Sequence, residues 1–161
     1  MWSTAVSPSS SILLRRKPPW RSSSTRYRSA LPRKKAYAAL ATSAGLKGWW
    51  TADSKADEKV GGRAEFGFDR RSVVFRMTIE KLDPGRQLVW ICQGGDDPEW
   101  NGTTLSWTIT PEDKGSTLRF THSGCKSVGD YFAMCNSTWG ELMYRLKDYV
   151  EGRNPGPHWK E

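Results

Sequence analysis

The stretch VGDYFAMCNSTWGELMYRLKDYVEG, residues 128–152, decides the fold. Its apolar residues recur every three or four positions, which predicts one long amphipathic helix. Gly152 follows the last apolar residue and marks the predicted helix end. An apolar helix face must pack against another apolar surface. The predicted apolar stripe consists of Val128, Tyr131, Phe132, Cys135, Trp139, Leu142, Met143, Leu146, Tyr149 and Val150.

Upstream of this helix the apolar pattern changes to alternation, which is typical of half-buried β-strands. Turn signals such as Gly61-Gly62 and Asp83-Pro84-Gly85 separate the alternating segments. The predicted strands are residues 24–31, 64–69, 71–82, 86–92, 102–110 and 116–124. We therefore expect an α+β fold in which a curved antiparallel sheet of about six to seven strands wraps around the C-terminal helix.

Two short helices are predicted between the first strand and the rest of the sheet. Residues 33–40 carry apolar side chains at helical spacing. Thr42 or Ser43 is a suitable N-cap for a second helix that contains Leu46, Trp49 and Trp50. The segment GLKGWW, residues 45–50, thus places two large indoles side by side. They either pack in the core or contact a ligand.

The length of 161 residues suits one domain, and nine tryptophans favour either an aromatic core or an aromatic pocket. The net charge of +8 is unevenly distributed. Residues 1–52 contain ten Lys or Arg and no acid, whereas residues 53–161 contain fifteen Lys or Arg and seventeen acids. The basic character belongs to the N-terminal third, so it does not indicate a nucleic-acid-binding face on the folded body.

Residues 1–23 are rich in Ser, Arg and Pro and are predicted to be disordered. Three interpretations stay open: a transit-like segment, a basic tail that contacts nucleic acid or anionic lipid, and a start codon assigned too early. We expect a folded domain over residues 24–152 and a tail over residues 153–161.

The cysteine pattern favours reduced thiols and a cytoplasmic location. Cys92, Cys125 and Cys135 form an odd set without CxxC spacing. Two histidines without ligand spacing predict no zinc site, and we expect no cofactor.

No apolar run reaches the length of a membrane span. The acidic loop with Asp96, Asp97 and Glu99 is interpreted as a solvated loop rather than a metal site.

Four stretches carry a resemblance to a known family: AYAALATSAGLKGWWT (36–51), residues 61–92, WNGTTLSW (100–107) and residues 116–152. The chain resembles the START-like superfamily, also called helix-grip or polyketide cyclase-like. More narrowly, it is similar to the branch of the C-terminal domain of the activator of heat shock protein 90 ATPase. Cys125 departs from the aromatic residue that this family usually carries after HSG.

This resemblance implies a cavity between the sheet and the long helix that holds a small hydrophobic or aromatic molecule. Trp49 and Trp50 are expected at its mouth, where they act as a plug or a lid, and Trp100 is expected to fold over it. The sheet and helix residues expected to line it are Phe66, Phe68, Phe75, Met77, Trp90, Trp107, His122, Tyr131, Cys135 and Trp139.

The predicted function is non-enzymatic binding of a small hydrophobic ligand. One alternative is a co-chaperone-like activator of heat shock protein 90 ATPase, and another is a cyclase, aromatase or hydrolase. His122 is the catalytic candidate, with Asp130 and Glu141 as neighbouring acids near or on the helix. It is otherwise a core histidine or a polar anchor for a ligand.

Overall fold

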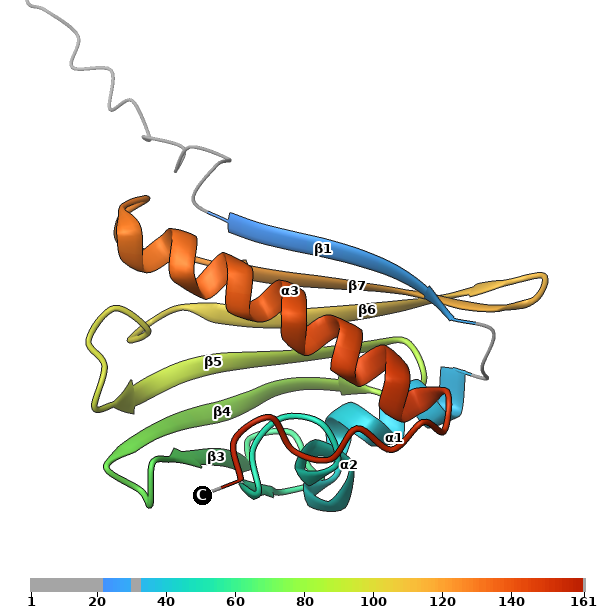
Figure 1. Cartoon of the computed structure of the whole chain (residues 1–161), viewed down its shortest axis with the longest axis horizontal. Helices are drawn as coiled ribbons and strands as arrows, with labels where there is room; N and C mark the ends of the chain where they lie inside the picture. Colours follow the sequence, from blue (N-terminus) through green and yellow to red (C-terminus); the bar gives the residue numbers. More distant parts are fainter. Residues whose placement is uncertain (1–21, 30–32, 161) are drawn as a thin grey trace, which may run out of the picture.

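The computed structural model describes residues 22–29 and 33–160, and in it a curled antiparallel sheet packs against one long helix (Figure 1). The α+β helix-grip architecture is therefore confirmed. Of residues 1–23, which were predicted to be disordered, residues 1–21 lie outside the described residues, whereas Ser22 and Ser23 belong to the first strand. The elements in order are β1 (Ser22–Ser29), α1 (Arg33–Ala41), α2 (Ser43–Lys47), β2 (Asp53–Ala56), β3 (Arg63–Phe68), β4 (Val73–Asp83), β5 (Gln87–Gly95), β6 (Thr104–Glu112), β7 (Gly115–Ser123) and α3 (Asp130–Val150).

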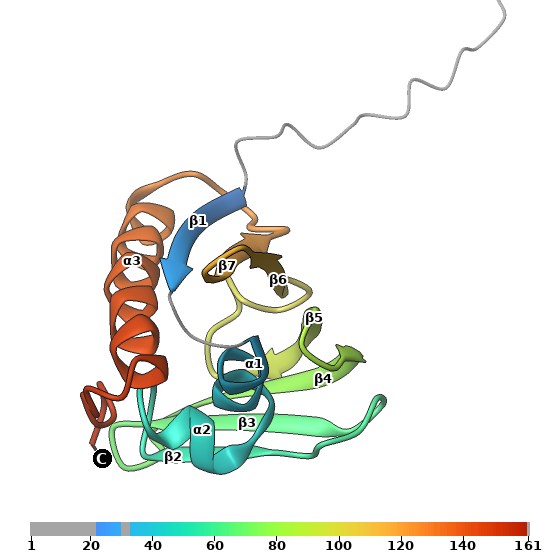
Figure 2. The ribbon, with the colours of Figure 1, turned by 90° about the vertical axis from the view of Figure 1, so that its right-hand side faces the viewer.

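The sheet has seven strands in the order β1-β7-β6-β5-β4-β3-β2, and every neighbouring pair is antiparallel. β1 and β2 follow each other among the strands of the chain but lie at opposite edges of the sheet. α1 and α2 carry the chain between these edges, and α1 contacts both the sheet and α3 (Figure 2). The register between β4 and β5 shifts twice, between Arg76 and Met77 and between Ile79 and Lys81, and these shifts accompany the curvature, since bulges bend a strand.

The residues around the tryptophan pair differ from the prediction in two ways. Thr42 is the N-cap, as predicted, and its side chain accepts a hydrogen bond from Gly45 N. However, α2 ends at Lys47, so Trp49 and Trp50 lie in the turn that follows. Strand β2 was missed because its sequence, DSKA, is short and mostly polar. It forms because the edge of β3 offers backbone partners along its whole length.

The core is built mainly from aromatic rings. Five tryptophans are fully buried, and their rings contact one another and neighbouring phenylalanines. Trp50 stacks on Phe66 with 4.1 Å between centroids, and Phe120 lies 4.3 Å from Trp139. Such contacts add to the free energy gained by burying the large rings. The buried tryptophans are Trp49, Trp50, Trp90, Trp107 and Trp139.

The apolar stripe of α3 is buried only along its C-terminal half. Trp139, Leu142, Met143, Leu146 and Val150 are buried there. Between Asp130 and Thr138 no side chain is fully buried, and Met134 is 56% exposed. Val128 was predicted on the stripe, but it precedes Gly129, the N-cap, and is 51% exposed. The first turns of α3 therefore leave part of the sheet face uncovered.

The segment after α3, predicted as a tail, folds back onto the body. Gly152 makes the turn with a φ of +83°, a conformation that favours glycine. Arg145 Nη2 then donates to the carbonyls of residues 155, 156 and 157 at 2.8–3.2 Å. Trp159 pairs with the turn after α2: His158 N and Trp159 N donate to Trp50 O, and Ala52 N donates to Trp159 O. Within the described part of the chain, no helix has the length and apolarity needed to cross a membrane.

Candidate functional site

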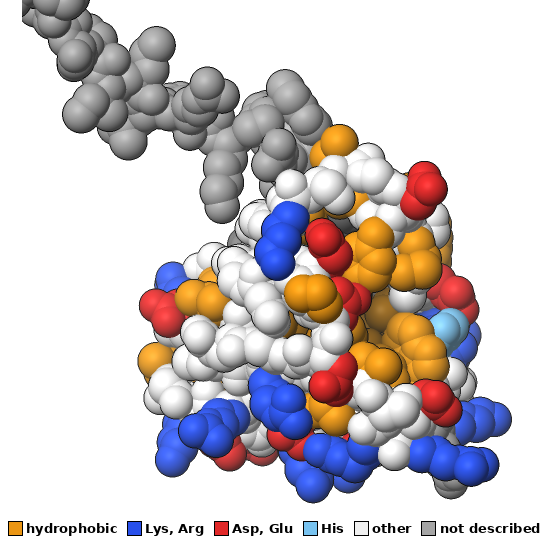
Figure 3. Space-filling view, turned by 90° about the vertical axis from the view of Figure 1, so that its left-hand side faces the viewer, with side chains coloured by type: hydrophobic (Ala, Val, Ile, Leu, Met, Phe, Trp, Pro, Cys, Tyr) orange, Lys and Arg blue, Asp and Glu red, His pale blue; other side chains and the backbone are white. Residues whose placement is uncertain are grey.

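A surface pocket of about 300 Å³ lies between the sheet and the first turns of α3. In Figure 3 hydrophobic side chains surround a hollow, acidic side chains lie beside it, and many Lys and Arg side chains lie along the lower edge of the view. The pocket exists because the exposed half of α3 stands away from the aromatic sheet face. Its lining residues are Trp50, Phe68, Val73, Phe75, Asp97, Trp100, Tyr131, Met134, Cys135, Thr138, Trp139, Leu142 and Trp159.

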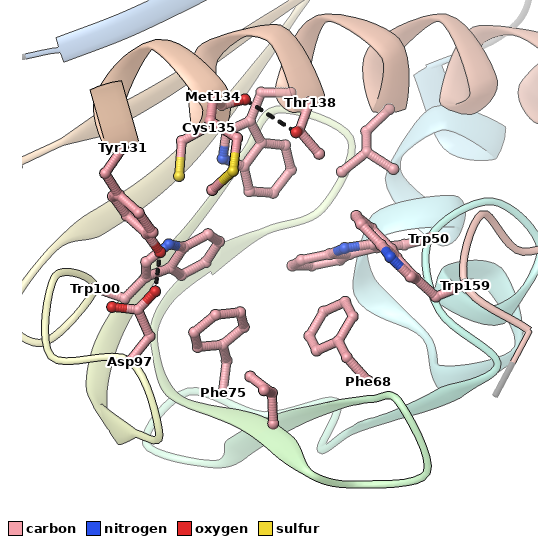
Figure 4. A pocket seen from close by; sticks show the side chains of 13 residues that line it. Trp50, Phe68, Phe75, Asp97, Trp100, Tyr131, Met134, Cys135, Thr138 and Trp159 are labelled. Carbon is pink, nitrogen blue, oxygen red and sulfur yellow. Dashed lines mark hydrogen bonds between the residues drawn. The ribbon is translucent and has the colours of Figure 1, made fainter. Parts of the chain in front are cut away.

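The sheet side of the pocket comes from β3 and β4. Alternation along paired strands places Phe68 and Phe75 on the concave face, with 5.4 Å between their ring centroids. Phe75 also stacks on Trp100 at 4.2 Å with an interplanar angle of 11°. Figure 4 shows these rings below the α3 side chains that close the pocket from the other side.

The loop after β5 holds a carboxylate and an indole in fixed positions. Asp97 Oδ1 accepts a hydrogen bond from Glu99 N at 2.9 Å, which closes a tight side-chain turn. Trp100 O accepts from Thr103 Oγ1 at 2.7 Å, and Trp100 is 6% exposed. The loop was predicted to be solvated, and Asp97 is only partly so, because it is half-buried and lines the pocket.

Tyr131 connects this loop to α3. Its hydroxyl donates a hydrogen bond to Asp97 Oδ2, as Figure 4 shows. Burial raises the pKa of Tyr131 far above its usual range, and the bond to Asp97 raises it further. The phenol is therefore a neutral donor at physiological pH and orients the carboxylate at the rim of the pocket.

The folded-back C-terminal segment supplies the remaining wall. Trp159 meets Phe68 edge-on, with centroids 5.0 Å apart and an interplanar angle of 88°. Trp50 lies beside both, since its ring centroid is 6.4 Å from that of Phe68 and its carbonyl accepts the backbone N–H of Trp159. One wall of the pocket thus depends on a segment outside the sheet and helix that form the body.

Seven of the predicted cavity residues meet around this pocket, and six do not. The seven are Trp50, Phe68, Phe75, Trp100, Tyr131, Cys135 and Trp139. Trp49 does not lie at the mouth, because it is fully buried and its Nε1 donates to Ala39 O at 3.0 Å. The others that pack in the core beneath the pocket are Phe66, Met77, Trp90, Trp107 and His122.

The lining also contains residues that the sequence reasoning missed. Met134 and Thr138 lie one helical turn from predicted α3 residues, so a wider stripe would have included them. Leu142 was placed on the stripe but not in the cavity. Val73 was likewise predicted on the same strand face as Phe75 but not in the cavity. Asp97 and Trp159 come from segments without periodicity.

His122 lies in the core and is 2% exposed. Burial lowers its pKa to about 4, so the ring is neutral at pH 7 and a weak base. Its Nε2 has no hydrogen-bond partner among the described residues, and its ring lies 4.8 Å from that of Trp100. Of the two acids considered as partners, Glu141 faces His158 Nδ1 at 3.2 Å and Asp130 is exposed.

The three cysteines are free, and burial raises the pKa of each thiol. Cys125 and Cys135 line a second cavity of about 10 Å³ next to His122. Raised thiol pKa values disfavour a nucleophilic thiolate. The described residues contain no group of three or more His, Cys, Asp or Glu side chains placed to hold a metal ion.

Comparison with known proteins agrees with this architecture. A solution structure of the Aha1 dimer from Colwellia psychrerythraea is 30% identical and has a TM-score of 0.73, over 81% of this chain and 96% of that one. Protein MLL2253 from Mesorhizobium loti is 19% identical with a TM-score of 0.72, over 83% and 98%. An AHSA1-like protein from Aeromonas hydrophila is 18% identical with a TM-score of 0.65, over 87% and 99%.

The similarities to the Mesorhizobium loti and Aeromonas hydrophila proteins show the fold alone, because both are below 25% identity. No curated protein sequence matches the chain significantly. The family model described as Activator of Hsp90 ATPase homolog 1-like protein matches residues 30–151, which include both short helices, the sheet from β2 to β7 and the whole of α3. The chain therefore belongs to the Activator of Hsp90 ATPase homolog 1-like family, within the START-like superfamily.

Proposed function

We propose that this protein binds a small, largely apolar molecule in the pocket between the sheet and the first turns of α3, without transforming it. The observation that carries the proposal is the pocket itself. Its volume of about 300 Å³ is at the lower end of the range for small-molecule sites. Aromatic side chains dominate the lining, and a few placed polar groups, Asp97 and Thr138 among them, can orient a ligand.

The proposal is tested by blocking the pocket. Thr138 lines the pocket, and the neighbouring Ser137 is exposed on another face of α3. Both hydroxyls donate to the carbonyl four residues earlier, at 3.0 Å and 3.1 Å, so they are closely matched. We expect Thr138→Phe to fill the pocket and weaken binding more than about ten-fold, because the ligand loses its space. Ser137→Phe serves as the control and should bind as the unmodified protein does.

The ligand is sought by native mass spectrometry of protein purified gently from cells, followed by solvent extraction. We expect a bound molecule of defined mass in the unmodified protein and in Ser137→Phe, but not in Thr138→Phe. Equal loading of both variants would contradict the proposal, as would an empty protein that binds no apolar compound in a fluorescence titration.

A second candidate function is activation of a heat shock protein 90 ATPase, which the description of the family model favours. It is tested by measuring the ATPase rate of the chaperone with and without this chain. A third, an enzyme that uses His122 as a base, has less support, because the ring does not line the pocket between the sheet and α3 and its pKa is about 4. Free thiols are consistent with action in the reducing cytoplasm.

A further inference from the structure

We propose that the pocket selects an organic cation, namely a quaternary ammonium group attached to a small apolar body. This inference rests on the proposed function, since it names the class of ligand for the same site. It comes from two features that occur together: a continuous wall of aromatic rings, and a single carboxylate among the lining residues.

The aromatic wall is suited to a cation because the faces of aromatic rings carry partial negative charge. A cation within about 6 Å of a ring centroid is attracted to it, most strongly by Trp. Trp50 and Trp139 have centroids 5.2 Å apart, and Trp100 and Trp139 are 6.0 Å apart. Rings this close let one compact cationic head approach several of them together. The aromatic lining residues are Trp50, Phe68, Phe75, Trp100, Tyr131, Trp139 and Trp159.

The charge of the lining favours the same ligand class. Asp97 is the one charged side chain among the described residues that line the pocket. It is half-buried, so its negative charge is screened less than a fully exposed one would be. The nearby Lys126 is exposed, donates to the carbonyl of Pro98 and does not line the pocket. An anionic ligand would meet this carboxylate without a compensating cation in the lining.

The hydrogen bonds of Asp97 favour a quaternary rather than a primary ammonium. Oδ1 already accepts from Glu99 N and Oδ2 accepts from Tyr131 Oη. These bonds fix the carboxylate and occupy part of its acceptor capacity. A primary ammonium has three donors to satisfy, and an aromatic wall offers few acceptors. A quaternary ammonium has no N–H donor, so it needs only contact with apolar groups and a nearby negative charge.

The test uses three probes with one shape and different charge. They are benzyltrimethylammonium, its neutral isostere neopentylbenzene, and the anion phenylmethanesulfonate. Binding is followed by quenching of tryptophan fluorescence and by calorimetry. We expect the cation to bind about ten-fold or more tightly than neopentylbenzene, in line with cation–π and charge contributions. The sulfonate should bind more weakly than both.

Asp97→Asn removes the charge and keeps the shape of the side chain, because its one amide oxygen can accept from Glu99 N and its amide N–H can donate to the Tyr131 hydroxyl. It should weaken binding of the cation about ten-fold and leave neopentylbenzene unchanged. Asp96→Asn is the control, because Asp96 is the exposed neighbour, its Oδ2 accepts from Val74 N at 2.8 Å, and it does not line the pocket. A melting curve of each variant confirms that it is folded.

The outcomes separate this inference from the proposed function. If the cation and neopentylbenzene bind equally, or the two Asp variants weaken cation binding equally, the selection of a cation by Asp97 is overturned and the apolar site stands. If none of the three probes binds, the inference fails, and the proposed function then depends on the extracted ligand. If the protein binds the cation ten-fold more tightly than neopentylbenzene, and only Asp97→Asn removes this preference, the result supports both the inference and the proposed function.

Discussion

Trp49 and Trp50 are consecutive residues whose side chains have different partners. The Trp49 indole donates a hydrogen bond to Ala39 O. This carbonyl belongs to the last turn of α1, where carbonyls accept no hydrogen bond from within the helix. The Trp50 ring lies among five other aromatic rings and also lines the pocket. One residue therefore stabilises the end of α1, and the next connects the core to the pocket.

This difference gives a prediction for the pair. Trp49→Phe should lower the free energy of unfolding by about 1–3 kcal/mol, because it leaves Ala39 O without its buried donor. It should leave ligand affinity unchanged, since Trp49 does not line the pocket. Trp50→Ala should cost about 3–5 kcal/mol and also weaken binding. Urea unfolding and fluorescence titration measure the two effects, and a Trp49→Phe variant with weakened binding would contradict the assignment.

His122 predicts a pH dependence of stability. Its pKa is about 4 in the folded protein and 6.5 in a solvated histidine, so the unfolded chain binds more protons between these values. Stability is therefore present above pH 6.5 and is lost as the pH falls towards 4, by roughly 3 kcal/mol from this group. In His122→Phe, the urea concentration at the midpoint of unfolding should depend less on pH over this range. A variant with the same slope as the unmodified protein would argue against a neutral core histidine.

At the scale of elements, the close approach of α1 and α2 depends on Gly45. A Cβ at this position would lie 2.4 Å from Ala38 O and 2.7 Å from Ala39 Cα, which are backbone atoms. Gly45→Ala should therefore destabilise the protein by about 1–3 kcal/mol, although alanine has the higher helix propensity by about 1 kcal/mol.

Gly140→Ala in α3 is the matched control, because a Cβ there would have no atom within 4 Å outside its own helix backbone and chain neighbours. It should raise the free energy of unfolding by about 0.5–1 kcal/mol. Thermal melts of the two variants should move in opposite directions. If both melting temperatures rise, the contact between α1 and α2 is looser than the structure indicates.

A helix or strand could be predicted from the sequence when its apolar pattern extends over many residues. α3 was predicted because its apolar period continues over most of its 21 residues. The sequence did not reveal that only its C-terminal half is buried, because Tyr131 and Cys135 follow the same helical period as Trp139 and Leu142. β2 has only four residues, three of them polar, and was missed, since its pairing is determined by the edge of β3.

At the scale of the whole molecule, the C-terminal segment is held by Arg145 through three backbone carbonyls. Arg145→Met should remove these bonds and lower the free energy of unfolding by about 1–3 kcal/mol. Hydrogen exchange should become faster at residues 158–159, and ligand binding should weaken because Trp159 no longer forms a wall.

Arg153→Met is the control for this prediction. Arg153 is also an arginine of the same region, but it forms exposed ion pairs with Asp148 and Glu151. Its removal should leave exchange at residues 158–159 and ligand affinity nearly unchanged, because exposed pairs contribute little. Equal effects of the two substitutions would show that general charge, and not the bonds of Arg145, holds the segment.

The overall architecture could be predicted from the sequence, whereas the pocket could be predicted only in part. Alternation and the α3 stripe indicated which rings lie between sheet and helix, but not which of them line open space. Phe66 and Phe68 share one strand and one pattern, yet only Phe68 lines the pocket. Asp97 and Trp159 are positioned by hydrogen bonds of loops, which leave no period in the sequence.

The order of the strands also has a consequence for the time course of folding. β1 is the first described strand of the chain, but its partner β7 begins only at Gly115. During synthesis β1 therefore cannot pair with β7 until six further strands, β2 to β7, have left the ribosome. Closing so long a loop costs entropy before any contact is gained, which slows folding. We expect β1 to join last, so the first of the described strands to be synthesised completes the sheet.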